Sequence, residues 1–183
     1  GGLVNTATFR AVADALGAAG KDRDWFVYSG VHPNPVEQDV REAAQCYRDH
    51  GCDGVIALGG GSPLDAGKAA RLLVKRPGFD FAKFYDEPDW SGLAPCIAIP
   101  TTAGTGSEIT LAAVITDPVT HRKAPIVDSK MIPGYVALDA QIMKGMPPGI
   151  TAATGMDALT HAVESYLSKA SSTTTEEHAT AAV

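Results

Sequence analysis

The chain has 183 residues, of which 45% are hydrophobic and 20% are charged, and its formal net charge is −6. This length suits one globular domain, or one domain with part of another. The acidic balance and the lack of a Lys/Arg cluster argue against nucleic acid as the main partner. No apolar run approaches the roughly 18 residues of a membrane-spanning helix.

Cysteine usage and the opening residues indicate a cytoplasmic protein. The three cysteines, Cys46, Cys52 and Cys96, are an odd number and contain no CxxC pair. They therefore fit free thiols in a reducing compartment better than a disulfide framework. The opening stretch GGLVNTATFR lacks the basic and then apolar layout of a signal peptide.

The first part of the chain predicts a helix, a strand and a second helix. Residues 5–19 favour a helix because apolar residues recur along one side and Gly20 follows its end. The sequence WFVYSG at 25–30 predicts a short buried strand. The proline-rich VHPNP at 31–35 predicts a stiff turn, which leads into a second helix over 36–50.

The middle of the chain alternates apolar strands with loops of small residues. A continuous apolar strand over 54–62, GVIALGGGS, runs into glycines, and we expect it to be buried on both faces. Pro63 opens a helix over 63–75. An apolar strand followed by a loop recurs at 95–107. Three further strands are expected at 108–117, 123–128 and 134–138.

This order of elements predicts an α/β fold with a parallel sheet, in which ligands bind beyond the carboxyl ends of the strands. From Gly149 onward the pattern is helical. We expect the sequence to be a piece of a longer protein, because no strand precedes the first helix. In addition, a capping-box pattern, Thr174 with Glu177, starts a helix just before the chain stops.

The glycine-rich stretch GGGSPLDAGK, from Gly59 to Lys68, invites three nucleotide-binding interpretations. A P-loop would need Gly and Ser or Thr where this chain has Ser62 and Ala69, and a Rossmann fingerprint would need Gly where Leu64 stands. The third interpretation needs no motif, because glycines let the backbone approach a phosphate that faces the N-terminus of the next helix. A tight turn that uses glycine only for its backbone freedom is the alternative.

The loop TTAGTGS at 101–107 favours phosphate binding. Its Thr and Ser hydroxyls can donate to a ligand, and Gly104 and Gly106 keep its backbone accessible. Two such loops beyond neighbouring strands would form one crevice suited to a dinucleotide. A flexible Ser/Gly connection is the alternative, but it explains less well why both loops follow apolar strands.

Asp157 and His161 are four residues apart, so they lie on one face of the expected C-terminal helix. An Asp oxygen and a His nitrogen can both bind a divalent metal. Periodicity favours a plainer interpretation, in which the pair belongs to the solvated face of an amphipathic helix. The neighbouring apolar stripe, which we expect to be core, comprises Met156, Leu159, Val163 and Tyr166.

Three long motifs together resemble the iron-containing (group III) alcohol dehydrogenases, and VHPNP fits a family loop before them. The motifs are GGGSPLDAGKA at 59–69, IPTTAGTGSEIT at 99–110 and MPPGITAATGMDALTHAVESY at 146–166. Their order and spacing match the family. The resemblance implies an NAD(P)-dependent oxidoreductase with an α/β nucleotide-binding domain, here 1–148, and an all-helical metal-binding domain that begins at 149–183.

The resemblance also implies which residues bind the cofactor, NAD or NADP. The matching positions lie in the PNP turn (33–35), the GGGS turn (59–62) with its following helix, the Thr-Thr loop (101–107) and two later strands. They are Asn34, Gly60, Gly61, Ser62, Asp65, Thr101, Thr102, Gly104, Thr105, Val114 and Lys123.

For the metal, the resemblance implies that Asp157 and His161 are the first two ligands of a catalytic Fe²⁺, or sometimes Zn²⁺, between the two domains. A bound metal acts as a Lewis acid on an alcohol or aldehyde, while hydride passes between the alcohol carbon and nicotinamide C4. Two further histidine ligands are expected beyond Val183. The family's acidic residue for the adenosine ribose is absent from this sequence.

The resemblance therefore implies an alcohol dehydrogenase or aldehyde reductase that acts on small substrates as a homo-oligomer of two or more subunits. For the 183 residues alone, two alternatives stand beside the enzyme. One is a catalytically incomplete module that binds a nucleotide or pairs with another subunit. The other is a remnant that cannot fold, because lost elements would leave apolar surface exposed.

Overall fold

The computed structural model describes residues 2–20, 24–81, 90–117 and 120–183. A parallel sheet places β2 (Cys96–Pro100) between β1 (Val55–Gly59) and β5 (Tyr135–Val136). A separate antiparallel pair is formed by β3 (Ala112–Thr116) and β4 (Lys123–Val127). The predicted α/β fold with a parallel sheet is confirmed, although two of the predicted strands pair with each other instead of joining that sheet.

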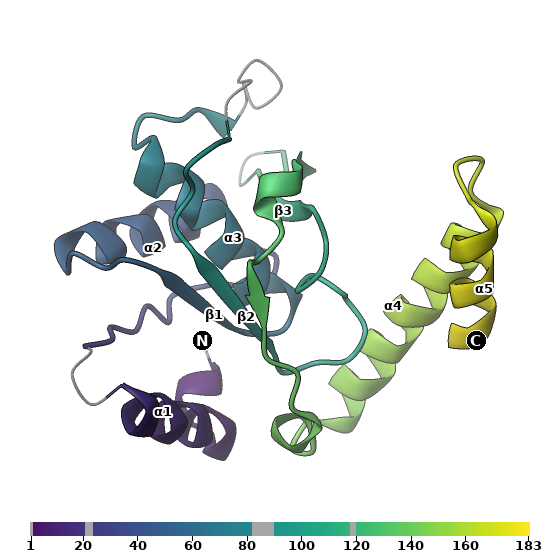
Figure 1. Ribbon diagram of the computed structural model, residues 1–183, viewed down its shortest axis with the longest axis horizontal. Helices are drawn as coiled ribbons and strands as arrows, with labels where there is room; N and C mark the ends of the chain where they lie inside the picture. Colours follow the sequence, from purple (N-terminus) through teal and green to yellow (C-terminus); the bar gives the residue numbers. More distant parts are fainter. Residues whose placement is uncertain (1, 21–23, 82–89, 118–119) are drawn as a thin grey trace.

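Helix α3 (Gly61–Lys75) is the centre of the α/β part, because it contacts β1, β2 and β3 while α2 (Glu37–Asp49) packs against its outer side. Figure 1 shows α1 (Ala7–Ala19) apart from these two helices. The short helix η1 (Gly2–Asn5) precedes α1, whose Thr8 hydroxyl donates to the Ile142 carbonyl in η4 (Ala140–Met143) at 3.2 Å. Helix η3 (Ser129–Met131) follows β4.

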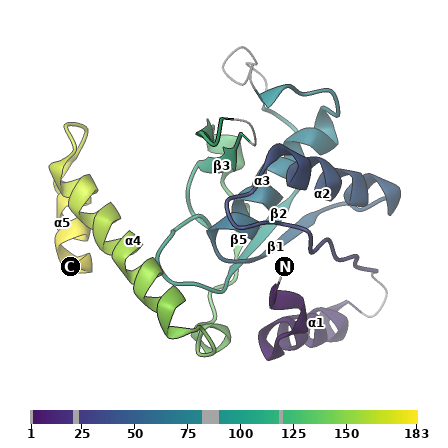
Figure 2. The same ribbon diagram turned by 180° about the vertical axis from the view of Figure 1, so that it is seen from behind.

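Helices α4 (Pro148–Leu167) and α5 (Thr173–Ala182) pack against each other and extend to one side of the sheet in both views (Figures 1 and 2). The helical character predicted from Gly149 is thus confirmed. The predicted cap of α5 is wrong by two residues, because the Ser172 hydroxyl accepts the Thr175 N–H at 3.3 Å. None of the helices in the described ranges combines the length and apolarity needed to cross a membrane.

The strand predicted at 25–30 is wrong. Trp25, Phe26 and Val27 are between 44% and 47% exposed, and no backbone hydrogen bond joins this segment to another in the described part of the chain. A strand needs a neighbouring backbone to pair with, and an apolar sequence alone does not supply one. Phe26 instead packs on His50, with 3.9 Å between ring centroids.

The strand predicted over 54–62 ends at Gly59, and α3 begins two residues before Pro63. Pro63 is tolerated there because the first N–H groups of a helix need no partner within the helix. The expectation that β1 is buried on both faces is also wrong. Ala57 beneath α3 is buried, whereas Ile56 on the opposite face is 41% exposed, because α3 covers only one face of the strand.

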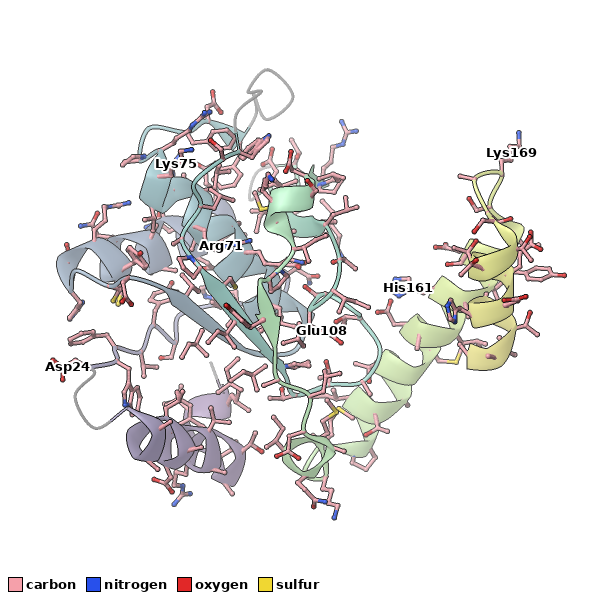
Figure 3. The ribbon with its side chains drawn as sticks, viewed as in Figure 1. Asp24, Arg71, Lys75, Glu108, His161 and Lys169 are labelled. Carbon is pink, nitrogen blue, oxygen red and sulfur yellow. The ribbon has the colours of Figure 1, made fainter. Side chains whose placement is uncertain are left out.

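The main core lies between α2, α3 and the β3–β4 pair. Its buried members include Val40, Ala44, Ala69, Leu72, Leu73, Ala113, Ile115, Ile126 and Met131. A second, smaller cluster joins α3 to the parallel sheet through Ala57, Leu64, Cys96 and Ala98. Arg71 of α3 (Figure 3) is also buried and donates to the carbonyls of Ala94, Lys130 and Met131. These bonds connect the segment just before β2 with η3.

The buried thiol of Cys96 predicts a loss of stability in alkali. Burial raises the pKa of this thiol above its ordinary value of 9.0, so the unfolded chain ionises at a pH where the folded chain stays protonated. The thiol's contribution is complete below pH 9 and is lost as the pH rises, at up to about 1.4 kcal/mol per pH unit. We expect Cys96→Ala to flatten the fall in unfolding free energy between pH 8 and 10 in urea titrations. Parallel curves for the two proteins would contradict this.

Candidate functional site

The two loops that follow β1 and β2 touch each other at the carboxyl edge of the parallel sheet. The Thr101 N–H donates to the Gly59 carbonyl at 2.8 Å. A β-carbon on Gly60 would lie 3.2 Å from the Thr102 side chain, and one on Gly61 would lie 3.1 Å from the Thr105 side chain. The structure therefore brings the GGGS turn and the Thr-Thr loop into one wall.

This wall presents the N-terminus of α3 and one buried hydroxyl that lacks a partner among the described residues. Gly60 caps α3 without a side-chain bond, so the first N–H groups of the helix and the positive end of its dipole face the loops. The Thr102 hydroxyl is buried and has no hydrogen-bond partner within the described ranges. A buried hydroxyl is normally bonded, so this atom marks a place where an oxygen or nitrogen of a ligand would complete the arrangement.

The PNP turn joins the wall from another side. Asn34 has a φ of +55°, and its N–H donates to the Ser62 hydroxyl at 3.2 Å. It lies at a hollow of about 440 Å³, which is lined by Pro33, Asn34, Val36, Thr116, His121 and Lys123. The Thr116 hydroxyl is a second buried oxygen that has no partner in the part of the chain that the structure describes. Asn34 and Lys123, far apart in sequence, thus share one hollow.

Asp65 and Val114 also come together, but by binding each other. The Val114 N–H donates to Asp65 Oδ2 at 3.0 Å, and the Ser107 hydroxyl donates to Asp65 Oδ1 at 2.6 Å. The ammonium of Lys68 lies 3.3 Å from the same Oδ1. Both carboxylate oxygens of Asp65 are therefore engaged by the chain itself.

Gly104 is the point where the Thr-Thr loop meets α4. A β-carbon on this residue would overlap the carbonyl oxygen of Thr154 and lie 2.7 Å from its carbonyl carbon. Only glycine allows so close an approach of two backbones. Thr154 precedes Asp157 by one helical turn, so the loop contacts α4 directly beside the candidate metal ligands.

Asp157 and His161 lie on one face of α4, with 3.9 Å between Asp157 Oδ1 and His161 Nε2. Their side chains are 44% and 52% exposed. Figure 3 shows His161 on α4 and Glu108 in the loop before β3. Across the described ranges, no group of three or more His, Cys, Asp or Glu residues is arranged to hold a metal. The pair therefore supplies one oxygen and one nitrogen donor.

The apolar stripe predicted beside this pair is not core. Met156, Leu159, Val163 and Tyr166 are between 37% and 61% exposed, and Ala162 is the buried residue of α4. The reason is that α4 packs mainly on α5, where Ala179 is buried in turn. Periodicity correctly found a helix with an apolar side, but it did not specify what covers that side.

Lys68, Thr110 and Thr116 carry no pattern in the sequence that indicates a role. Lys68 follows Gly67 as the lysine of a P-loop would, but Ser62 and Ala69 do not match the P-loop motif. Its burial beneath the Thr-Thr loop depends on contacts with Ser107 and Thr110, 39 and 42 residues away. The Thr116 hydroxyl had no distinguishing sequence signal.

Comparison with known proteins gives a consistent result. A family model described as iron-containing alcohol dehydrogenase matches residues 1–140. Lactaldehyde reductase of Escherichia coli (strain K12) is 42% identical over 169 residues, which are 91% of this chain and 44% of that protein. The crystal structure of a 1,3-propanediol oxidoreductase superposes with a TM-score of 0.88 at 37% identity and covers 97% of this chain and 46% of its own.

A sulfoacetaldehyde reductase from Bifidobacterium kashiwanohense, solved in complex with NAD⁺, has a TM-score of 0.79 at 36% identity. The match covers 88% of this chain and 43% of that one. The present chain thus spans less than half the length of each of these three proteins.

Proposed function

Because the chain belongs to the iron-containing alcohol dehydrogenase family, we propose that it forms the cofactor-binding part of an NAD(P)-linked oxidoreductase. The reaction would interconvert a small alcohol and its aldehyde. The observation that carries this proposal is the contact between the GGGS turn and the Thr-Thr loop at the carboxyl edge of the sheet, with the unpartnered Thr102 hydroxyl inside it.

In this proposal the N-terminus of α3 binds the cofactor phosphates through the backbone of Gly60 and Gly61 and through Ser62. The Thr-Thr loop contributes Thr101, Thr102, Gly104 and Thr105, and the hollow beside it contributes Asn34 and Lys123. Asp65 and Val114 contribute less directly, because they bind each other and so hold α3 against β3. These residues bind and orient the dinucleotide, which would supply the hydride acceptor.

We further propose that Asp157 and His161 are two of the ligands of the catalytic metal. The donor set fits Fe²⁺ or Zn²⁺, since it offers a carboxylate oxygen and an imidazole nitrogen on one helix face. A metal bound there would polarise the oxygen of the substrate. Residues 149–183 would then belong to a helical domain, and residues 1–148 to the nucleotide-binding domain.

Within this arrangement Gly104 has a positioning role. Its contact with Thr154 sets the separation between the cofactor loop and the helix that carries the two metal ligands. Hydride transfer requires cofactor and substrate to be held within a narrow range of distances, so this backbone contact would contribute directly to the geometry of the reaction.

A titration of the chain with NADH, followed by fluorescence, tests the nucleotide-binding proposal. We expect saturable binding that Gly61→Ala weakens about tenfold, because the new methyl group would press on Thr105. Gly78→Ala is the matched control, since a β-carbon there would meet nothing within 4 Å. Absence of NADH binding in the unmodified chain would refute the proposal.

We expect the 183-residue chain itself to show no NAD(P)-linked alcohol oxidation, because its described residues bring together two donors where a catalytic metal needs at least three. This favours a second candidate, a nucleotide-binding module that is catalytically incomplete. Activity assays with Fe²⁺ or Zn²⁺ and calorimetric metal titrations separate the two. Turnover that depends on added metal would identify the chain as an enzyme without further residues.

A further inference from the structure

Lys68 is buried on the side of α3 that faces the Thr-Thr loop. Its side chain is 0% exposed. The ammonium donates to the Ser107 carbonyl at 2.8 Å and to the Ser107 hydroxyl at 3.0 Å. It also lies within hydrogen-bonding distance of the Thr110 hydroxyl, at 3.2 Å, and of the Thr110 carbonyl, at 3.4 Å.

The surroundings of this ammonium differ from those of a lysine that binds a phosphate. A lysine ammonium has three N–H donors, and the oxygens of Ser107 and Thr110 are sufficient to accept all three. Asp65 Oδ1, 3.3 Å away, balances the charge. A buried charge is tolerated only with such partners. Lys68 is therefore saturated by the protein and has no donor left for a ligand.

The hydrogen-bond acceptors of Lys68 lie at the end of the Thr-Thr loop and just after it. Ser107 closes the TTAGTGS sequence, and its N–H donates to the Thr105 hydroxyl at 3.3 Å. Thr105 in turn lies against Gly61. Lys68 of α3 thus holds one end of the Thr-Thr loop through Ser107, while Thr105 in the same loop lies against Gly61 in the first turn of α3.

We propose that Lys68 is a positioning residue for the Thr-Thr loop. Its buried ammonium holds residues 101–111 in the conformation that binds the nucleotide. The proposal rests on the proposed function for the identity of the ligand, NAD(H), but not for the order of the loop. Lys68 acts through Ser107 and Thr110 and does not touch the cofactor.

The test compares Lys68→Met with Lys75→Met. The first variant removes the ammonium and retains an unbranched apolar side chain, while Asp65 keeps its bonds from Ser107 and Val114. The second makes the same change at an exposed position on the same helix. Amide hydrogen exchange by mass spectrometry measures loop order without any ligand, and NADH fluorescence measures the dissociation constant.

We expect Lys68→Met to raise the exchange rate of residues 101–111 at least tenfold, to leave α2 close to its original rate, and to raise the NADH dissociation constant about tenfold. Lys75→Met should match the unmodified chain in both measurements. Faster loop exchange in a chain that never binds NADH would support the positioning role and refute the proposed ligand. Unchanged loop exchange, or an equal increase throughout α2 and α3, would overturn the positioning role.

If Lys68→Met does not fold, Thr110→Val provides the same test in a milder form. It removes one hydroxyl acceptor of Lys68 and preserves the size of the side chain. We expect faster exchange confined to residues 101–111 and a roughly two- to fivefold weaker binding of NADH, because one hydrogen bond that holds the loop is lost. Exchange and affinity equal to those of the unmodified chain would overturn the proposal.

Discussion

Gly104→Ala is expected to weaken NADH binding by tenfold or more while the parallel sheet remains folded. The added β-carbon would overlap the Thr154 carbonyl, and relief of such overpacking typically costs about 1–3 kcal/mol. Since about 1.4 kcal/mol corresponds to a factor of ten in affinity, displacement of the loop from its place beside Gly60 and Gly61 accounts for the expected loss.

Two measurements together identify the cause of that loss. NADH fluorescence gives the affinity, and hydrogen exchange across α4 shows whether the helix moves away from the loop. Gly145→Ala is the matched control, because a β-carbon at this exposed loop position would meet nothing within 4 Å. If Gly104→Ala bound NADH as the unmodified chain does, with α4 unchanged, the loop–helix contact would have no functional role.

Asp65→Ala is expected to cause the largest loss of stability, about 3–5 kcal/mol, because it leaves the buried ammonium of Lys68 without its carboxylate. The change also removes the acceptor of the Ser107 hydroxyl and of the Val114 N–H. Urea unfolding followed by circular dichroism measures the free energy. Asp139→Ala, which removes only the exposed cap on the Gln141 N–H, should cost about 1 kcal/mol or less.

The pH dependence of this variant provides a further check. Burial lowers the pKa of Lys68 below its ordinary value of 10.5, and Asp65 opposes that shift. Without Asp65 the folded pKa falls further, so the unfolded chain binds more protons over a wider range below pH 10.5. The stability deficit of Asp65→Ala should therefore shrink as the pH rises from 7 toward 10. A deficit that stays constant or grows would show that Lys68 is not the group responsible.

The family could be predicted from the sequence, and so could the proximity of the two loops that form the candidate site. Two apolar strands are followed by GGGS and TTAGTGS, whose glycines and small hydroxyl side chains predicted two ligand-binding loops at the edge of a parallel sheet. The structure brings these loops into contact. The four-residue spacing of Asp157 and His161 placed both on one helix face, where they lie. In both cases the information is local, because strand pattern and helical period depend on neighbouring residues.

Local information failed where a residue's partner decided the outcome. The segment 25–30 has the composition of a strand but no backbone to pair with among the described residues, and the apolar side of α4 has the period of a core stripe but is exposed there. In each case the sequence indicates a preference for burial without identifying the surface that would cover it.

The sequence by itself thus determined the order of the helices and strands from residue 36 onward, the two loops and the pair of candidate ligands. Only the tertiary structure decided that Lys68 is buried under Ser107, that Asp65 binds the backbone of Val114, and that Gly104 meets α4. The physical reason is that hydrogen bonds and backbone contacts between distant segments depend on how helices and strands pack. Neither the spacing of residues along the chain nor their individual preferences specifies that packing.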